Sequence, residues 1–409
     1  MAAYDGTPQF ADGKVFAVKL PFMSIYFVLA IGLLNGTVVQ ASRVVLPLYA
    51  LDLDASALTV GLLGASFAVL PLILSVPFGK FADRFGVRWM LVLGALGGGA
   101  GMYVPYIVPE ISALFVASAV MGLTFGIFSV SLQNLVGQLS SVENRAQYFS
   151  NHSLAASGGN FLGPLIAGFS VEHSGNAEAC LYLAGLSLVP AAMLAIWGGA
   201  FPRGERAVTR ATGGIGTLLS EPGMKKTLTA SGLLLAGQDL YRIYMPVYGH
   251  TIGLTASTIG LVLAAFPAAS FFVRLIMKWL VARFREENLL VASFYAAAVC
   301  LVLIPLFKDA FVLATISFVF GLGMGCSQPI ITMLMYGNSP PGRSAEALGL
   351  LMSVVHFTRL IGPVTFGAIG SALGLLPMFV VNALMMGAGG LLSRPANKNP
   401  ELPDKPRLP

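Results

Sequence analysis

The sequence predicts an all-α membrane protein in which twelve transmembrane helices form two pseudo-symmetric six-helix bundles. Of its 409 residues, 56% are hydrophobic and only 10% are charged, with a mean hydropathy of +0.80. A soluble domain carries roughly a quarter charged residues. Two further observations support the prediction. Apolar runs of the ~20 residues that cross a bilayer recur along the whole chain, and a constant offset relates its first half to its second.

Each expected span is an apolar run that ends at a polar, charged or turn-forming segment. The spans cover residues 19–50, 56–78, 89–108, 110–138, 146–171, 177–200, 226–251, 256–281, 288–307, 309–337, 344–373 and 375–393. Runs that exceed the thickness of the hydrocarbon core must tilt or extend beyond it. The polar, Gly-rich and basic segment 201–225 separates the first six spans from the last six.

The expected organisation therefore has five parts. They are a cytoplasmic tail (1–18), a first six-helix bundle (19–200), a cytoplasmic linker (201–225), a second six-helix bundle (226–393) and a cytoplasmic tail (394–409). The N-terminus is polar, and no small-residue cleavage site follows a short apolar core, so no cleaved signal peptide is expected.

The distribution of basic residues predicts how the spans are oriented. With the N-terminus in the cytoplasm, Lys308 is the single basic residue in an outer loop, whereas Lys80, Arg84 and Arg88 share one cytoplasmic loop. This is the positive-inside pattern. We expect a multi-pass protein of the inner or plasma membrane with both termini in the cytoplasm. The sequence pI near 9.2 reflects this topology, so no nucleic-acid partner is expected.

The three cysteines lie far apart in apolar segments, at Cys180, Cys300 and Cys326. This spacing provides neither a disulfide framework nor a zinc site. We therefore expect small packing residues, no metal site and no cofactor.

The two halves of the chain match at an offset of 199 residues. The offset relates Pro47 to Pro246, Gly61 to Gly260, Gly122 to Gly321 and Pro164 to Pro363. Six spans in each half would insert both halves the same way up, which makes a parallel repeat. Transporters built from such repeats bind their substrates between the halves, near the middle of the membrane.

A motif between the second and third spans adds a family resemblance. Residues 79–91, GKFADRFGVRWML, resemble the G-x-x-x-D-R-x-G-x-R signature of the major facilitator superfamily, with matches at Gly79, Asp83, Arg84, Gly86 and Arg88. The chain resembles this family over nearly its whole length. The resemblance implies a monomeric secondary transporter that works by alternating access and is not an enzyme. It also implies that this motif gates the transporter.

Other segments resemble gating elements of the same family. Glu143 and Arg145, in the next cytoplasmic loop, would be ion-pair partners of the motif. The fifth span contains GNFLGPLIAG, which is similar to a motif of proton-coupled exporters in which Gly163 and Pro164 bend a helix that packs against the other half. Helix packing alone is the alternative explanation, because RLIGPVTFG repeats the pattern in span eleven. The fourth span lacks the arginine that drug/proton antiporters of this family carry there.

Two arginines occupy equivalent apolar segments, Arg43 in SRVVLPLYA and Arg242 in YRIYMPVYG. A charge at the bilayer centre costs roughly 2.5–3.5 kcal/mol, so both arginines are candidate functional residues. They resemble the pair that holds the anion in organophosphate/phosphate exchangers of the family. The alternative is that both brace the outer gate through helix-end carbonyls. Tyr49 and Tyr248, further outward, are either gating residues or ordinary interface aromatics.

Further polar residues on the expected cavity-lining spans complete a candidate substrate site. They are Gln40, Gln133, Gln238, Gln328 and Arg359.

Asp239 is the single carboxylate inside an expected span and shares a helix face with Arg242, three residues further on. One interpretation is a permanent ion pair between the two. The other is proton coupling, in which an anionic substrate engages Arg242 and frees Asp239 to take a proton. His356, near Arg359, is a second candidate for proton coupling because histidine titrates near neutral pH, although it could also be a simple hydrogen-bond donor.

Transport is the function that these features favour. No G-x-x-x-x-G-K-[ST] motif is present, which argues against ATP-driven pumping, so the energy source should be an ion gradient, with protons first, or solute exchange. The favoured substrate is a small organic anion, a carboxylate or a phosphate ester. The alternative is proton-coupled efflux of amphipathic drugs or metabolites. A non-transporting receptor on this fold is a third interpretation, against which the gating motif argues.

Overall fold

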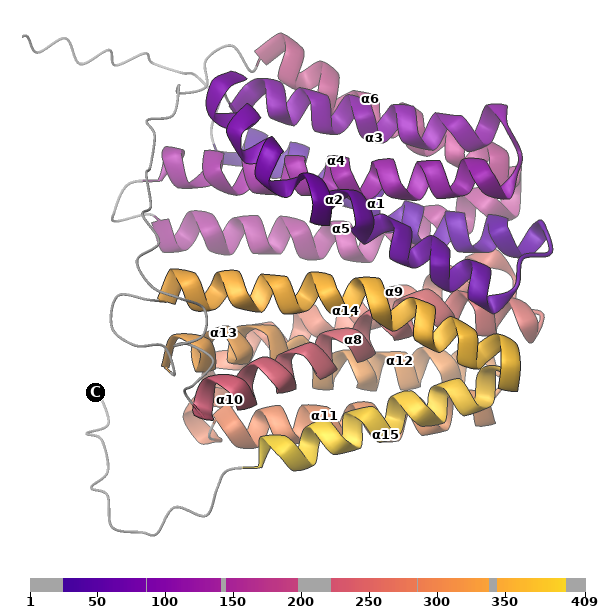
Figure 1. The fold of residues 1–409 in the computed structure, drawn as a ribbon, viewed down its shortest axis with the longest axis vertical. Helices are drawn as coiled ribbons and strands as arrows, with labels where there is room; N and C mark the ends of the chain where they lie inside the picture. The colour runs from indigo at the N-terminus through magenta and orange to yellow at the C-terminus, as the bar shows by residue number, and fades with distance from the viewer. Residues whose placement is uncertain are drawn as a thin grey trace, which may run out of the picture.

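The computed structural model consists of helices that run roughly parallel and antiparallel to one another (Figure 1). It describes residues 25–85, 87–140, 145–197, 222–284, 286–337 and 344–394. Among these residues every regular element is helical.

The helices agree closely with the expected spans. In the first half they are α1 (Ile25–Asp52), α2 (Ala57–Phe85), α3 (Val87–Ile107), α4 (Ile111–Leu139), α5 (Arg145–Ser174) and α6 (Asn176–Trp197). In the second half they are α8 (Pro222–Thr251), α9 (Ala256–Leu275), α10 (Met277–Arg283), α11 (Glu286–Leu303), η2 (Ile304–Leu306), α12 (Ala310–Gly325), α13 (Ser327–Gly337), α14 (Ser344–Leu373) and α15 (Leu375–Ser393).

Two expected spans are each divided between two helices. The eighth breaks at Ile276, between α9 and α10, and the tenth breaks at Cys326, between α12 and α13. Three glycines in the six residues before Cys326 lower the local helix preference. The local sequence offers no such reason at Ile276.

Most of these helices have the length and apolarity of membrane spans. Within the described ranges, nine helical segments are long and apolar enough to cross a bilayer. The other three long helices, α2, α8 and α14, contain 29, 30 and 30 residues, so each is long enough to cross a bilayer. Both α8 and α14 carry polar residues of the central site. Large apolar side chains face outward, as lipid contact requires; Phe311, for example, is 80% exposed. The chain is therefore a multi-pass membrane protein.

The connections that reverse the chain direction and are described in full all lie at one end of the helices (Figure 1). These connections are residues 53–56, 108–110, 175, 252–255, 307–309 and 374, and we call that end the short-loop side. Figure 1 shows α1 to α6 grouped in one part of the molecule and α8 to α15 in the other. The first expected tail lies outside the described residues, as do the second tail after Arg394 and the linker before residue 222.

Contacts between the two halves repeat at the offset of 199 residues. A Cβ added at Gly61 of α2 would meet the Pro363 carbonyl oxygen of α14. A Cβ added at Gly260 of α9 would meet the Pro164 carbonyl oxygen of α5. Both the glycines and the prolines are equivalent positions. The internal repeat therefore produces two related helix contacts, and glycine lets the backbones approach at both.

Hydrogen bonds at the helix ends join the same two pairs of helices on the short-loop side. The Leu58 backbone N–H donates to Ser371 Oγ at 2.8 Å, and the Ser257 backbone N–H donates to Glu172 Oε2 at 2.8 Å. These residues again lie 199 positions apart. The halves are thus held together on the short-loop side by a repeated set of contacts.

We expect Gly260→Ala to weaken this contact, because the new methyl group must displace the Pro164 carbonyl. Overpacking of a close contact costs about 1–3 kcal/mol. The melting temperature of the purified protein should fall, and a cysteine introduced at the half-buried Ala256 of the same contact should react faster with a membrane-impermeant maleimide.

Gly387→Ala is the matched control, since no atom outside its own helix lies within 4 Å of the added Cβ. This variant should be neutral or slightly stabilised, because alanine favours helix over glycine. Equal effects of the two variants would contradict the proposed role of Gly260.

Candidate functional site

A polar cavity of about 310 Å³ lies between the two halves. It extends from the middle of the helices toward the side opposite the short loops. Its lining comes from α1, α4, α5, α8, α9, α12 and α14. The polar and charged lining residues are Asn35, Gln40, Ser129, Gln133, His152, Ser157, Asn160, Gln238, Asp239, Arg242, Ser270, Arg274 and Arg359.

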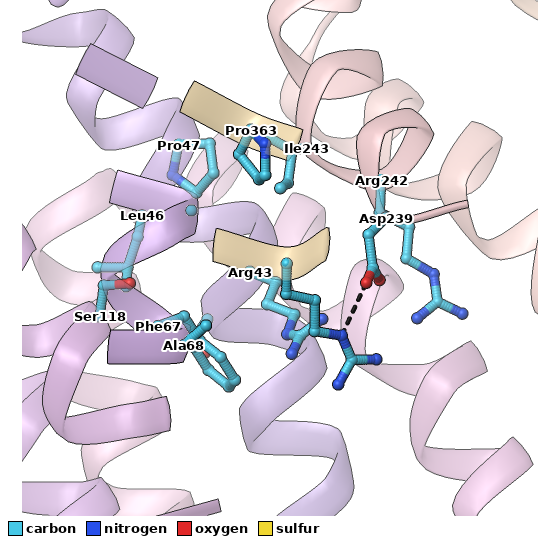
Figure 2. A pocket seen from close by; sticks show the side chains of 13 residues that line it. Arg43, Leu46, Pro47, Phe67, Ala68, Ser118, Asp239, Arg242, Ile243 and Pro363 are labelled. Carbon is cyan, nitrogen blue, oxygen red and sulfur yellow. Dashed lines mark hydrogen bonds and ion pairs between the residues drawn. The ribbon is translucent and has the colours of Figure 1, made fainter. Parts of the chain in front are cut away.

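Arg43 and Arg242 occupy equivalent places beside the deep end of this cavity. Figure 2 shows both side chains, with that of Asp239, in an adjoining pocket of about 60 Å³. The Arg43 guanidinium lies 4.2 Å from the centroid of the Phe67 ring, and that of Arg242 lies 5.2 Å from the Phe266 ring. Phe67 and Phe266 are also 199 residues apart. Each arginine is thus oriented by a cation–π contact from its own half.

Asp239 pairs with Arg359, which corrects the interpretation that placed its ion pair on Arg242. Arg359 Nε donates to Asp239 Oδ2 at 2.7 Å, and the Asp239 side chain is only 9% exposed. Arg242 interacts with the carboxylate electrostatically, as does Arg43. The hydrogen-bonded partner therefore comes from α14 rather than from the next turn of α8.

The equivalent pair in the first half is neutral. Gln40 Nε2 donates to Asn160 Oδ1 between α1 and α5. Gln40 is equivalent to Asp239, and Asn160 is equivalent to Arg359. One position in the repeat thus holds an amide pair in the first half and an ion pair in the second.

Positive charge exceeds negative charge around the described centre. Arg43, Arg242 and Arg359 bring three guanidinium groups, against the single carboxylate of Asp239. Arg274 adds a fourth guanidinium group, which donates to neutral partners, Ser157 Oγ at 2.8 Å and the Gly325 carbonyl at 3.5 Å. A low-dielectric site with this imbalance favours a bound anion.

The expected glutamines lie around the same cavity where they are described. Gln40, Gln133 and Gln238 line it, whereas the side chain of Gln328 lies outside the description. His356, one turn before Arg359, is half-buried and does not line this cavity.

Among the expected gating residues of the cytoplasmic motif, Arg88 can be placed in full. Its Nε donates to the Leu194 carbonyl at 3.3 Å and its Nη2 to the Ala195 carbonyl at 2.7 Å, at the end of α6. It therefore caps a helix of its own half. The other motif residues lie where side chains are not described, namely Gly79, Asp83, Arg84, Gly86, Glu143 and Arg145.

The remaining gating candidates make helix contacts. A Cβ at Gly163 would collide with Gln40 of α1, which shows why α5 requires glycine there. The Tyr49 hydroxyl donates to the Pro105 carbonyl at 3.5 Å, and the Tyr248 hydroxyl donates to the Phe307 carbonyl at 2.8 Å. Both tyrosine bonds stay within one half, which favours interface aromatics over a gate between the halves.

Several polar residues of the cavity lining are absent from the sequence-based site, among them Asn160, His152 and Arg274. Asn160 could have been found through its equivalence to Arg359. His152, whose buried Nδ1 has no hydrogen-bond partner in the described structure, stands out in no sequence pattern. The position of Arg274 near the cytoplasmic end of the eighth span suggests a structural residue whose side chain extends to the membrane surface. The structure instead places it in the lining of the cavity.

The fold and cavity define a class of protein, a membrane transporter built from two related helical halves around a central site. Its sequence matches the profile of the Major Facilitator Superfamily over residues 28–335 and 227–408. The chain belongs to this superfamily. Small-molecule transport driven by an ion gradient is the activity that this membership implies.

Similar proteins come from bacteria and archaea. The quinolone resistance protein NorA of Staphylococcus aureus is 26% identical over 339 residues, which cover 80% of this chain and 84% of NorA. An uncharacterized MFS-type transporter of Methanocaldococcus jannaschii is 20% identical over 357 residues, which cover 85% of this chain and 92% of its relative.

Solved transporter structures share the fold at low sequence identity. The nucleoside transporter NupG superposes with a TM-score of 0.73 at 14% identity, covering 90% of this chain and 98% of NupG. A peptide transporter, POT, in complex with sulfate superposes with a TM-score of 0.74 at 14% identity, covering 90% of this chain and 93% of POT.

The charge imbalance predicts how stability responds to substitution. We expect Asp239→Asn to lower the melting temperature more than Arg359→Gln does, because the first raises the excess positive charge and the second reduces it. Removing one partner of a buried ion pair costs about 3–5 kcal/mol.

The double variant Asp239→Gln/Arg359→Asn is the control, because it copies the Gln40–Asn160 pair of the first half. It should recover most of the stability that Asp239→Asn loses. A double variant as unstable as Asp239→Asn would show that the two pairs are not structurally interchangeable. Thermal unfolding in detergent without added anions measures all three.

Proposed function

We propose that the protein is a secondary active transporter that moves a small organic anion by alternating access. Arg43 and Arg242 bind the acidic group, a carboxylate or a phosphate ester. The observation that carries this proposal is the excess of guanidinium groups over carboxylates in a cavity between the two halves.

The chemistry of arginine fits this role. Its planar group donates two parallel hydrogen bonds to a carboxylate or phosphate. Arg43 Nε is buried and has no hydrogen-bond partner among the described atoms, so it is a donor that a bound anion would satisfy. The outer-gate interpretation needs bonds from these arginines to helix-end carbonyls, whereas their described contacts are aromatic rings.

The position of the cavity fits one state of an alternating-access cycle. The short-loop side is held closed, with His250 Nε2 3.3 Å from Asp52 Oδ1 across the halves, and the cavity extends the other way. With the linker side cytoplasmic, as the basic residues predict, this is the inward-facing state. The cytoplasmic position of both termini and a monomeric protein belong to the same proposal.

Asp239 is the proposed site of proton coupling. The Asp239 carboxylate interacts with the same arginines that would bind an anion. An anionic substrate bound to Arg242 would therefore compete with this carboxylate for the positive charge. The displaced carboxylate then takes a proton, since a like-charged neighbour and a low dielectric favour the neutral acid. Anion and proton would thus occupy the site together. His356 does not line the cavity that contains Asp239, so it is the weaker candidate.

Efflux of an amphipathic compound is a second candidate function. The likeness to NorA, a quinolone resistance protein, supports it. So does the apolar part of the cavity lining, which includes Phe125, Phe128 and Phe266. Aromatic rings suit a flat drug molecule, and the arginines would then serve structure rather than substrate binding.

The first experiment is a thermal-shift screen of the purified protein with carboxylates, phosphate esters and cationic amphiphiles. A ligand at 100 times its Kd should stabilise the folded state by about 2.7 kcal/mol. We expect stabilisation by one class of anion, reduced at least tenfold in apparent affinity in Arg43→Ala and in Arg242→Ala.

Arg283→Ala is the control, because this arginine is exposed at the end of α10. It should leave binding unchanged. Stabilisation by cationic amphiphiles alone, unaffected by Arg242→Ala, would reject the anion proposal and favour efflux.

Proton coupling is tested by transport into proteoliposomes under an imposed pH gradient. We expect Asp239→Asn to remove the dependence of transport on the gradient while exchange of substrate persists, because an amide cannot take the proton. Glu110→Gln, at an exposed short-loop residue, is the control. Gradient-driven accumulation by Asp239→Asn would rule out Asp239 as the coupling residue.

A further inference from the structure

A second cavity, of about 890 Å³, lies between α8 and α14 on the side away from the central site. Its walls are largely apolar, and Met385 of α15 contributes to them. Phe357 and Ile361, which also line it, are 62% and 46% exposed, so the groove opens at the lipid-facing surface. Thr358 and Thr365, in its wall, donate to carbonyls of their own helix at 3.0 Å. We call this cavity the α8–α14 groove.

The two halves differ in sequence where the groove lies, because the equivalent helices α1 and α5 pack closely there. There, α1 and α5 meet through glycines, with Gly159 against the Gly36 backbone and Gly158 against Leu33. The offset of 199 residues replaces Gly158 by Phe357 and Gly159 by Thr358. At these positions α14 therefore carries larger side chains where α5 carries the glycines that let α1 and α5 touch.

The groove has the length and the depth of a lipid chain in one leaflet. Along α8 its lining runs from Lys225 to Leu240, which is about 22 Å at 1.5 Å per residue. That exceeds half of a ~30 Å hydrocarbon core. Lys225 lies in the first turn of α8, on the side opposite the short loops, where a headgroup would be.

The charge of Lys225 indicates which class of lipid headgroup the groove would favour. Lys225 is exposed and is the charged residue of the described lining. Its neighbour Lys226 donates to the Arg394 carbonyl and does not line the groove. We propose that the α8–α14 groove binds an anionic phospholipid, with one acyl chain along α8 and the phosphate at Lys225.

Such a lipid would affect the central site through the helices that it separates. The groove is lined by Leu240 and Thr358, which are sequence neighbours of Asp239 and Arg359. The ion pair joins the same two helices from the cavity side. The bound acyl chain therefore sets the spacing across which the ion pair must form.

The test is native mass spectrometry of the purified protein with defined mixtures of phosphatidylglycerol and phosphatidylcholine. We expect the wild type to retain phosphatidylglycerol preferentially. One lysine near an anionic headgroup corresponds to about fivefold tighter binding of phosphatidylglycerol than of phosphatidylcholine. Lys225→Gln should remove this preference, and Lys225→Arg should keep it. A Lys225→Gln variant with unchanged preference would overturn the headgroup assignment.

A second pair of variants tests the acyl chain. Ala236→Phe places a large ring in the groove and should abolish retention of both lipids, whereas Val299→Phe, at an exposed site on α11, should not. Thr358→Leu fills the same space if Ala236→Phe fails to fold. Equal lipid retention in Ala236→Phe, Thr358→Leu and Val299→Phe would overturn the proposal. So would a dimer of the wild type that Ala236→Phe dissociates, since a second copy would then be the occupant.

Discussion

The burial of arginine charge between two apolar halves constrains the whole central site. A guanidinium group in a low-dielectric interior must be hydrogen-bonded, stacked or paired to be tolerated. Arg43 and Arg242 are stacked on phenylalanine rings, Arg359 is paired with Asp239, and Arg274 donates to neutral oxygens. These partners hold the arginines but leave their charge largely uncancelled. This uncancelled positive charge is the physical basis of the anion site that we propose.

The internal repeat shows which features are general and which are specialised. Glycine contacts, prolines and aromatic stacking recur in both halves, because both must close against each other on the short-loop side. The Gln40–Asn160 and Asp239–Arg359 pairs differ at equivalent positions. The second pair is charged, so its energy depends more strongly on charge that enters or leaves the cavity. Under the proposed function, the response to a substrate or a proton would be largest between α8 and α14.

Much of the fold follows from the sequence alone, because hydropathy determines where helices cross the membrane and the offset of 199 residues predicts the repeated contacts. Arg43, Arg242 and Asp239 could be placed at the centre for the same reason. The partner of Asp239 could not. Residues three apart on one helix, such as Asp239 and Arg242, invite a local pairing, whereas the contact with Arg359 depends on how α14 packs beside α8. The cavity position of Arg274 likewise depends on helix rotation.

The difference between the two helix seams has a mechanical consequence. Where α1 and α5 touch backbone to backbone through Gly36 and Gly159, little can deform without breaking close packing. Between α8 and α14 lies a groove instead, and an acyl chain of the lipid that we propose there would deform more easily than such a backbone contact. The first half is then the rigid frame of the transporter and the second half its compliant part, so elastic strain during the transport cycle should collect on one side of an otherwise symmetric molecule.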